Sequence, residues 1–365
     1  MMSELLKHIK NRIALKGPLS VSDYMREALF NSEHGYYMTG DPLGKQGDFI
    51  TAPEISQMFG ELIGLWCAVI WEEMGSPKKI NLIEMGPGRG TLMADALRAI
   101  SSVPRLSAAI NIHIVETSPS LQRRQKRNLK TLSSNIEWHE SFQDVPAGPL
   151  ILIANEMFDV LPIRQFVKST SSWVERKVGC NGLGELAWVL DQSCLISDNL
   201  IPPQLMRSKL GSTFELGKIA VDLVSNITRS VVKYGGAALI IDYGYLKSGV
   251  GDTLQAVKNH SYADILSEPG KSDLTAHVDF ECLAKNARTT GGVVCGPVTQ
   301  RDFLRRLGIE SRAAQLKNSA STRQKSEVLT GLNRLIGTDE MGNLCKVMAI
   351  VHPDHLFPEG FSIKN

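Results

Sequence analysis

The sequence predicts an α/β fold, a doubly wound parallel sheet with a helical N-terminal region and an inserted antiparallel β element. Two observations predict the sheet. From about residue 79 onward, apolar runs alternate with amphipathic stretches, which is typical of parallel strands covered by helices. The first apolar run, INLIEM, leads into a loop with glycines at positions 86, 88 and 90. Such a strand–loop–helix turn commonly receives a cofactor.

Residues 1–73 are expected to be mostly helical and to contain one long loop. The first stretch places Leu5, Leu6, Ile9 and Ile13 on one face of an amphipathic helix, without the continuous apolar core of a signal peptide. A glycine-rich segment, HGYYMTGDPLGKQGDFITAPE, then precedes a strongly apolar helix, ISQMFGELIGLWCAVIWEEM. We expect this loop to fold over a cofactor as a lid. The apolar helix has enough hydrophobic surface for core packing or for a homodimer interface.

The sheet elements follow in order. Expected strands are INLIEM, INIHIVE, IEWHE, PLILIANE, AALIIDYG, GVVCGPVTQ and CKVMAIVHP, and expected helices include TLMADALRAI, PSLQRRQKRNLK, FELGKIAVDLVSNITRSVVKYG and DFECLAKNARTTG. Three short runs, RQFVKS, SWVERKVG and ELAWVLD, interrupt the alternation and predict the antiparallel insertion. The chain therefore divides into an N-terminal helical region with the lid loop (1–73), a first core part (74–163), the insertion (164–212), a second core part with helical additions (213–351) and a tail (352–365).

Composition excludes several classes of function. The chain has 365 residues, a net charge of +2 and 43% hydrophobic residues, which is ordinary for a globular protein. It has no basic stretch interleaved with aromatics, so nucleic acid is not an expected partner. No apolar segment approaches the roughly 20 residues that span a bilayer, so membrane insertion is not expected. The six cysteines form no C-x-x-C pair, and Pro353 and Asp354 interrupt the spacing of His352 and His355, so no metal site is expected.

The glycine loop favours a cationic cofactor over a nucleotide phosphate. A P-loop needs a lysine after the last glycine, and none follows Gly90. A dinucleotide fingerprint is G-x-G-x-x-G, but Thr91 stands where its third glycine belongs, and Glu84 would face a pyrophosphate of like charge. S-adenosylmethionine carries an ammonium and a sulfonium instead, which a carboxylate attracts. Purely structural glycines are the alternative. The residues predicted to hold the methionine end are Glu84, Gly86, Pro87, Gly88, Gly90 and Thr91.

A second carboxylate supports this interpretation. The next strand, INIHIVE, ends at Glu116. In doubly wound sheets, the acidic residue that ends the second strand accepts hydrogen bonds from ribose hydroxyls. An exposed acid that caps the following helix is the alternative. Order and position together favour the cofactor role for Glu116.

The acceptor of the methyl group is predicted to lie after the fourth strand. Asn155, Glu156 and Asp159 follow this strand directly, and ligands of open α/β sheets bind outside the carboxyl ends of the strands. Carboxylates suit a guanidinium best, because it stays protonated in water and pairs bidentately with them. Asp48 and Glu54, in the stretch GDFITAPEIS, are further candidates. Glu156 and Asp159 have an alternative role as caps of the following loop, and Glu54 also fits a plain helix start after Pro53.

The chain also resembles a known family. The blocks YMREALFNSEHGYY, GDFITAPEISQMFGELIG, IEMGPGRGTL, NEMFDVLPIRQF, IDYGY, DLTAHVDF and MGNLCKVMAI occur in this order, from about residue 17 to residue 351. Together they resemble the MidA family, which includes a mitochondrial complex I assembly factor with protein arginine methyltransferase activity. The resemblance implies a class I methyltransferase core with a Rossmann-like sheet, S-adenosylmethionine as cofactor, and Asn155 at the cofactor. In the mitochondrial branch it implies symmetric dimethylation of an arginine on a core complex I subunit.

The resemblance also shows a departure from better-known arginine methyltransferases. Those enzymes have a second glutamate further along the acidic loop, where this chain has LPIRQF and no acid. The second carboxylate would come from Asp159, Asp48 or Glu54. His277 and Asp279 are further pocket candidates, although Asp279 also suits a helix cap. Asp242 and Tyr243, at the end of the IID strand, are candidates as well.

These patterns predict a methyltransferase that uses S-adenosylmethionine to modify a protein arginine. Its catalytic residues would be Glu156, Asp48, Glu54 and Asp159. The alternatives are methylation of a small molecule and a non-catalytic role as a cofactor-binding assembly factor, while an NAD-dependent dehydrogenase is favoured least. A bacterial protein of this kind is expected in the cytoplasm, and a eukaryotic one in the mitochondrial matrix.

Overall fold

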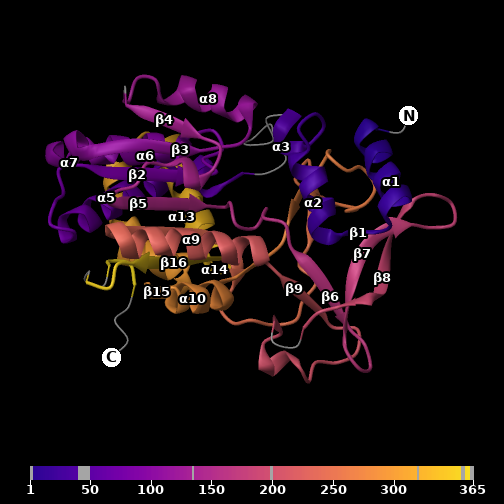
Figure 1. Ribbon diagram of the computed structural model, residues 1–365. Helices are drawn as coiled ribbons and strands as arrows, with labels where there is room; N and C mark the ends of the chain where they lie inside the picture. The colour runs from indigo at the N-terminus through magenta and orange to yellow at the C-terminus, as the bar shows by residue number, and fades with distance from the viewer. Residues whose placement is uncertain are drawn as a thin grey trace. The chain divides into compact units, whose positions relative to one another are not determined.

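The structure, a computed structural model, describes residues 3–39, 50–133, 135–197, 200–318, 320–354 and 358–361. The chain forms two compact units, each built from segments that are distant in sequence (Figure 1). The antiparallel unit comprises Met1–Phe49, Asp159–Asp222 and Lys247–Asp279. The parallel-sheet unit comprises Ile50–Phe158, Leu223–Leu246 and Phe280–Asn365. The five-part division made from the sequence stays a prediction.

The parallel-sheet unit is organised around one sheet. Its strands are β2 (Ile80–Met85), β3 (Ile110–Val115), β4 (Ile136–His139), β5 (Leu150–Asn155), β10 (Gly236–Tyr245), β15 (Val293–Thr299) and β16 (Cys345–Val351). They lie in the order β15-β16-β10-β5-β2-β3-β4. The strands from β10 to β4 are parallel, and β16 lies antiparallel between β10 and β15. This arrangement confirms the predicted α/β fold.

Helices connect and cover these strands. They are α4 (Ala52–Ile55), α5 (Gln57–Glu73), α6 (Thr91–Ile100), α7 (Pro104–Ala109), α8 (Pro119–Leu129), α9 (Lys218–Tyr234), α10 (Phe280–Thr289), α11 (Gln300–Arg306), α12 (Ile309–Asn318), α13 (Thr322–Ile336) and α14 (Met341–Leu344), with a short 3₁₀ helix, η1 (Phe142–Asp144). Alternate strand residues such as Leu82, Ile112 and Ile153 share one core cluster with α5 and α6. The intervening residues point to the opposite face, because side chains alternate along a strand. Among the described residues, no helix is both long and apolar enough to cross a membrane.

Helices α5 and α6 pack unusually closely through glycines. A Cβ atom on Gly64 would lie 2.5 Å from the backbone oxygen of Ala96, and one on Gly60 would lie 2.5 Å from Cβ of Asp95. The large side chains of α5, including Phe59 and Trp66, are fully buried in the same core. The apolar surface of this helix is therefore used in packing within its own unit.

We expect Gly64→Ala to destabilise the protein even though alanine is the better helix former. The added methyl group meets the backbone of Ala96 and not a movable side chain, so the two helices must separate. Overpacking of this kind costs about 1–3 kcal/mol, against a helix-propensity gain of about 1 kcal/mol. Urea unfolding measures the difference. Gly182→Ala is the control, because nothing lies within 4 Å of its added Cβ. Unchanged stability of the Gly64 variant would contradict the close packing.

The antiparallel unit contains the predicted insertion. Its elements are α1 (Glu4–Lys16), β1 (Leu19–Ser20), α2 (Val21–Phe30), α3 (Tyr36–Thr39), β6 (Arg164–Lys168), β7 (Trp173–Cys180), β8 (Leu186–Leu195), η3 (Pro203–Leu205), β9 (Thr213–Leu216), β11 (Gln255–Lys258), β12 (Ser261–Ala263), β13 (Asp273–Thr275) and β14 (Val278–Asp279). One antiparallel sheet has the order β1-β7-β6-β9, with β8 paired to β7, and a second has the order β12-β11-β13.

One element differs from the prediction. The sequence predicted a helix that begins at Phe214, but Thr213–Leu216 forms β9, and α9 begins only at Lys218. Phe214 pairs with Phe166 of β6, and both rings are buried in a small cluster with Trp173. The pairing of β9 with β6 and the burial of Phe214 in this cluster therefore outweigh the helical period of the residues that follow.

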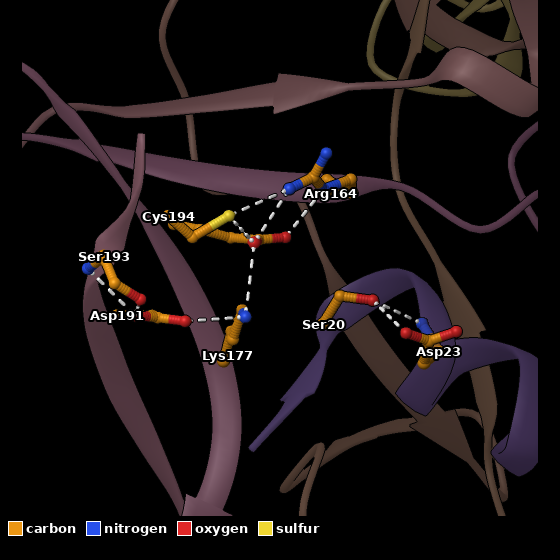
Figure 2. Close-up of polar contacts among 8 residues, drawn as sticks. Ser20, Asp23, Arg164, Lys177, Asp191, Ser193 and Cys194 are labelled. Carbon is orange, nitrogen blue, oxygen red and sulfur yellow. Dashed lines mark hydrogen bonds and ion pairs between the residues drawn. The ribbon is translucent and has the colours of Figure 1, made fainter. Parts of the chain in front are cut away.

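A network of charged side chains joins strands β6, β7 and β8 (Figure 2). Glu175 is 1% exposed, and its two oxygens accept hydrogen bonds from Nε and Nη2 of Arg164 at 2.7 and 2.8 Å. The Cys194 thiol donates to the same carboxylate at 2.9 Å. Burial opposes ionisation, yet these donors hold the pKa of Glu175 below its usual value. Glu175 is therefore buried as an anion, and removing Arg164 would leave an uncompensated buried charge, which is strongly destabilising. In the same unit, Ser20 caps α2.

Candidate active site

The topology of the parallel sheet marks one place for a ligand. Strands β2, β3 and β4 follow one another toward one edge of the sheet. The next strands in the chain that join this sheet, β5 and β10, lie on the other side of β2. The strand order thus reverses between β2 and β5. In open α/β sheets, ligands bind in the crevice outside the carboxyl ends of the strands at such a point. The predicted loop follows β2, and Asn155 and Glu156 lie at the end of β5.

The loop after β2 has the backbone that the glycine spacing predicted. Gly86, Gly88 and Gly90 have φ angles of 62°, 54° and 79°, in the left-handed region that other residues rarely adopt. The carbonyl of Pro87 accepts the Gly90 N–H at 2.8 Å, which closes the turn. Gly90 is the N-cap of α6, so the unpaired amides of the helix begin at Thr91. These amides provide partial positive charge at the mouth of the loop.

Two buried acceptors lie at neighbouring strand ends without a donor. Glu84 is 2% exposed, and Asn155 is 8% exposed. Across the described part of the chain, neither Oε2 of Glu84 nor Oδ1 of Asn155 has a hydrogen-bond partner. Burial raises the pKa of Glu84 to about 8, and a backbone hydrogen bond from Met93 opposes the shift. Buried acceptors without partners are costly, so these two atoms fit a ligand that donates hydrogen bonds, such as an ammonium.

Glu116 lies at the end of β3 and is largely occupied by contacts within the chain. Its Oε1 accepts the Ser118 N–H at 2.8 Å, and its Oε2 accepts from Nε2 of Gln125 at 3.1 Å. Burial raises the pKa of the carboxyl, and these hydrogen bonds oppose that shift. Each carboxylate oxygen has a second lone pair, so both can still accept from ribose hydroxyls.

Gln125 is the residue that sequence reasoning missed. Fully buried on α8, it donates to the carbonyl of Gly88 at 2.8 Å as well as to Glu116, and it accepts from Nε1 of Trp138 at 3.1 Å. Gln125 thereby connects the glycine loop to Glu116 through hydrogen bonds. A signal was present in the sequence, because Gln125 occupies the middle of the buried stripe formed with Leu121 and Leu129. A polar residue at an apolar position of such a stripe needs a partner.

Glu156 has a strained backbone and a shifted pKa. Its φ is 49°, which is unusual for a residue other than glycine and is often associated with functional sites. The side chain is half-buried, and Oε1 accepts from the Ala52 N–H at 2.7 Å and from Nδ2 of Asn155 at 3.1 Å. Burial raises the pKa of Glu156 to about 7. A carboxyl poised near neutrality can exchange a proton during a reaction.

Helix α4 brings a second predicted acid to the glycine loop. The Thr91 hydroxyl donates to Oε1 of Glu54, and Nη1 of Arg89 lies 3.8 Å from Oε2. Since Ala52 on the same helix contacts Glu156, α4 links the acid after β5 to the loop after β2. Glu54 therefore contacts the predicted cofactor loop itself.

The remaining candidates are placed differently. Asp242 is fully buried and uses Oδ2 to accept the Met157 and Phe158 N–H groups at 3.0 and 2.7 Å, so it fixes the loop after β5. Asp159 belongs to the antiparallel unit, where its carbonyl accepts the Ala276 N–H at 2.9 Å. His277 and Asp279 also belong to that unit. Residues 40–49 of the predicted lid, including Asp48, lie outside the described residues, as does His355.

Comparisons with known proteins agree with this geometry. A family model described as "Putative S-adenosyl-L-methionine-dependent methyltransferase" matches residues 62–298. A zebrafish protein named protein arginine methyltransferase NDUFAF7, mitochondrial, is 38% identical over 377 residues, covering 96% of this chain and 88% of the relative. The human protein of that name is 34% identical, with 96% and 84% covered. The chain belongs to this methyltransferase family.

A solved structure extends the agreement to the whole fold. The crystal structure of a Burkholderia thailandensis protein bound to S-adenosyl-homocysteine matches this methyltransferase with a TM-score of 0.85 and 25% identity, covering 98% of this chain and 92% of the other. The cofactor of this methyltransferase is S-adenosylmethionine. The predicted cofactor and enzyme class are thereby confirmed, while the roles of individual residues stay predictions.

We expect cofactor affinity to depend on pH through Glu84. Below its pKa of about 8, this carboxyl is protonated in the free protein and must lose a proton to pair with an ammonium. Affinity for S-adenosyl-homocysteine should therefore fall by up to about tenfold per pH unit as pH decreases from 8 to 6. Calorimetry in two buffers of different ionisation enthalpy would detect the released proton. Glu84→Gln should remove this dependence, whereas Glu72→Gln on the exposed end of α5 should keep it. A flat wild-type profile would contradict the assignment.

Proposed function

We propose that this methyltransferase modifies an arginine side chain of a protein, and that its substrate is a core subunit of respiratory complex I. The names of its mitochondrial relatives support the arginine, and the family resemblance supports the subunit. Within this chain, the observation that carries the proposal is Glu156. It is a half-buried carboxyl with a raised pKa, at the end of the strand beside the cofactor loop.

In this proposal, residues at three strand ends hold the cofactor. Glu84 and Oδ1 of Asn155 accept hydrogen bonds from its ammonium, and Glu116 accepts from its ribose. The loop Gly86–Gly90, with Pro87, and the helix start at Thr91 leave space for the methionine end. This assignment would give donors to Oε2 of Glu84 and Oδ1 of Asn155, which are buried and have no partner among the residues described.

Glu156 would hold and activate the acceptor. S-adenosylmethionine supplies a methyl group bonded to a cationic sulfur, and transfer forms an N–C bond while the C–S electron pair stays on sulfur. Glu156 pairs with the guanidinium and draws its positive charge away from the attacking nitrogen. The same carboxylate then accepts the proton that this nitrogen loses. Contacts support Glu54 best as the second carboxylate. Glu54 lies on α4, and Glu156 accepts a hydrogen bond from Ala52 of the same helix. Asp48 and Asp159 stay predicted contributors.

Location and assembly follow as finer parts of the proposal. We propose that a bacterial protein of this kind acts in the cytoplasm. A eukaryotic one would act in the mitochondrial matrix, because the named relatives are mitochondrial. The homodimer stays a prediction without further support, since the apolar surface of α5 packs within its own unit. Light scattering of the purified protein measures the oligomeric state directly.

The proposed function is tested by a methyl-transfer assay. Purified protein and isotopically labelled S-adenosylmethionine are added to lysate from cells that lack the gene, and labelled proteins are identified by mass spectrometry. The expected result is a labelled arginine on one respiratory-complex subunit. Label confined to small molecules would overturn the protein substrate. Full cofactor affinity without any turnover would favour a non-catalytic assembly role, and calorimetric binding of NAD would revive a dehydrogenase.

A further inference from the structure

Three side chains with metal-binding chemistry converge outside the set of residues assigned to the cofactor, although the His139 carbonyl accepts the Glu116 N–H at 2.9 Å. They are His113 on β3 and Glu137 and His139 on β4. Their neighbours Ile112, Ile114 and Trp138 join the core beneath α5 and α6. Because strand side chains alternate, the three converging residues lie on the opposite face of the sheet from that core. The register pairs His113 with Glu137, and His139 follows two residues later on the same face.

Hydrogen bonds fix the protonation of the central histidine. Nδ2 of Asn81 donates to the Pro146 carbonyl at 2.7 Å, so the other end of that amide, Oδ1, faces Nε2 of His113 at 3.3 Å. An amide oxygen only accepts, so Nε2 of His113 carries the proton. The lone pair of Nδ1 is then left to face His139. An oxygen acceptor behind one ring nitrogen is the usual support for a metal ligand through the other.

The distances suit a shared cation. Nδ1 of His113 and Nε2 of His139 are 3.0 Å apart. Two ligands at about 2.0–2.1 Å from one zinc ion lie roughly 3.4 Å apart at tetrahedral angles. Oε2 of Glu137 is 3.9 Å from Nδ1 of His113, and all three ligand atoms lie within 4.8 Å of one another. The glutamate side chain is 60% exposed, so it can rotate the remaining distance.

We propose that His113, Glu137 and His139 bind a divalent transition-metal ion of the zinc class, which joins β4 to β3. Two imidazoles and one carboxylate are ligands that zinc accepts, and the exposed side of the site leaves a fourth position for water. The burial of these residues agrees with a metal site that is open on one side. His113 is 2% exposed and held by hydrogen bonds, whereas Glu137 faces solvent. A plain hydrogen bond between the two imidazoles is the competing explanation of the 3.0 Å contact.

The site has a structural role in this proposal. Strand β4 is the last strand of the sheet and pairs only with β3 among the described strands. It is also short, Ile136–His139, and its Trp138 supports Gln125 on the other face. A metal ion that bridges β3 and β4 would therefore hold an edge strand that the cofactor loop depends on indirectly.

The test is a titration of the tag-free, metal-stripped protein with Co²⁺, followed by visible absorption. We expect one Co²⁺ per chain with a ligand-field band, displacement of that band by Zn²⁺, and a higher melting temperature with Zn²⁺. His139→Gln should weaken binding by at least about 100-fold, since loss of an outer-shell partner alone costs about 10- to 100-fold. Glu137→Gln, at an exposed position that should not disturb folding, should also weaken it.

A matched control and one alternative outcome complete the test. His260→Asn changes an exposed histidine of the antiparallel unit and should leave the cobalt spectrum unchanged. Absence of a stoichiometric band in the wild-type protein would overturn the proposal, as would an unchanged band in both His139→Gln and Glu137→Gln. Either result would leave the contact between His113 and His139 as a simple hydrogen bond. None of these readouts depends on methyl transfer, so they are independent of the proposed function.

Discussion

Replacing Gly88 by valine is expected to abolish cofactor binding. Gly88 has a φ of 54°, a conformation that a β-branched residue adopts only with severe strain. Its carbonyl is already held by Gln125 at 2.8 Å, so the loop cannot shift freely to accommodate a side chain. The new side chain would also fill space beside the predicted methionine end. We expect the Kd for S-adenosyl-homocysteine, measured by calorimetry, to rise by more than about 100-fold, which corresponds to about 2.7 kcal/mol.

Gly184→Val is the matched control for this substitution. Gly184 has a similar φ of 75°, nothing lies within 4 Å of its added Cβ, and it lies in the turn between β7 and β8. Both variants therefore carry comparable backbone strain, but only one changes the cofactor loop. The control should lose stability and keep its affinity. If Gly88→Val folds by circular dichroism and still binds S-adenosyl-homocysteine at the wild-type Kd, the placement of the loop is wrong.

Replacing Glu156 by glutamine is expected to reduce turnover sharply and to spare cofactor affinity. A glutamine side-chain oxygen can still accept from the Ala52 N–H, so the local structure should persist. The neutral amide can neither pair with a guanidinium as an anion nor accept its proton. Loss of such a group typically costs about 10²- to 10⁴-fold in rate. The measurement is kcat with a substrate from the lysate assay, alongside the Kd for S-adenosyl-homocysteine.

The pH profile separates this role from a structural one. With the pKa of Glu156 raised to about 7, its carboxyl is protonated below that pH and ionised above it. In the proposed mechanism the ionised form holds the acceptor, so at saturating cofactor the wild-type kcat/KM for the acceptor should rise with pH up to about 7 and then level off. Glu156→Gln should lose this rise in its residual activity, while the exposed control Glu140→Gln keeps it. Turnover equal to wild type in Glu156→Gln would remove this residue from the mechanism.

The sequence was most informative where local and long-range preferences agree. The run INLIEM is apolar, lies in the middle of the sheet and ends at glycines that need a left-handed backbone, so β2 and its loop were predictable. The predicted helix at Phe214 was wrong because β6 supplies a partner that no local pattern reveals. The short strands β11, β12 and β13 were also missed.

The site was predictable only in part. Glu84, Glu156 and the glycines were predicted as site residues because Glu84 lies near the end of an apolar strand and the others follow one. The contact of Glu54 with Thr91 and the role of Gln125 depend on tertiary packing between segments that are distant in sequence. Likewise, the sequence suggested Asp242 as a pocket residue, but its carboxylate binds backbone amides of the loop after β5. Such assignments require the fold, because composition does not reveal which donor meets which acceptor.

The buried amide of Gln125 bears on the entropy of cofactor binding. Its hydrogen bonds connect the glycine loop, Glu116 and Trp138 in the protein without a ligand. In the proposed cofactor site, the conformational freedom of these segments is therefore lost when the chain folds and not when the cofactor binds. A preorganised cradle of this kind needs little rearrangement to accept its ligand. Association should then be limited by diffusion and access, and the rigid side of the site should be the one that recognises the cofactor.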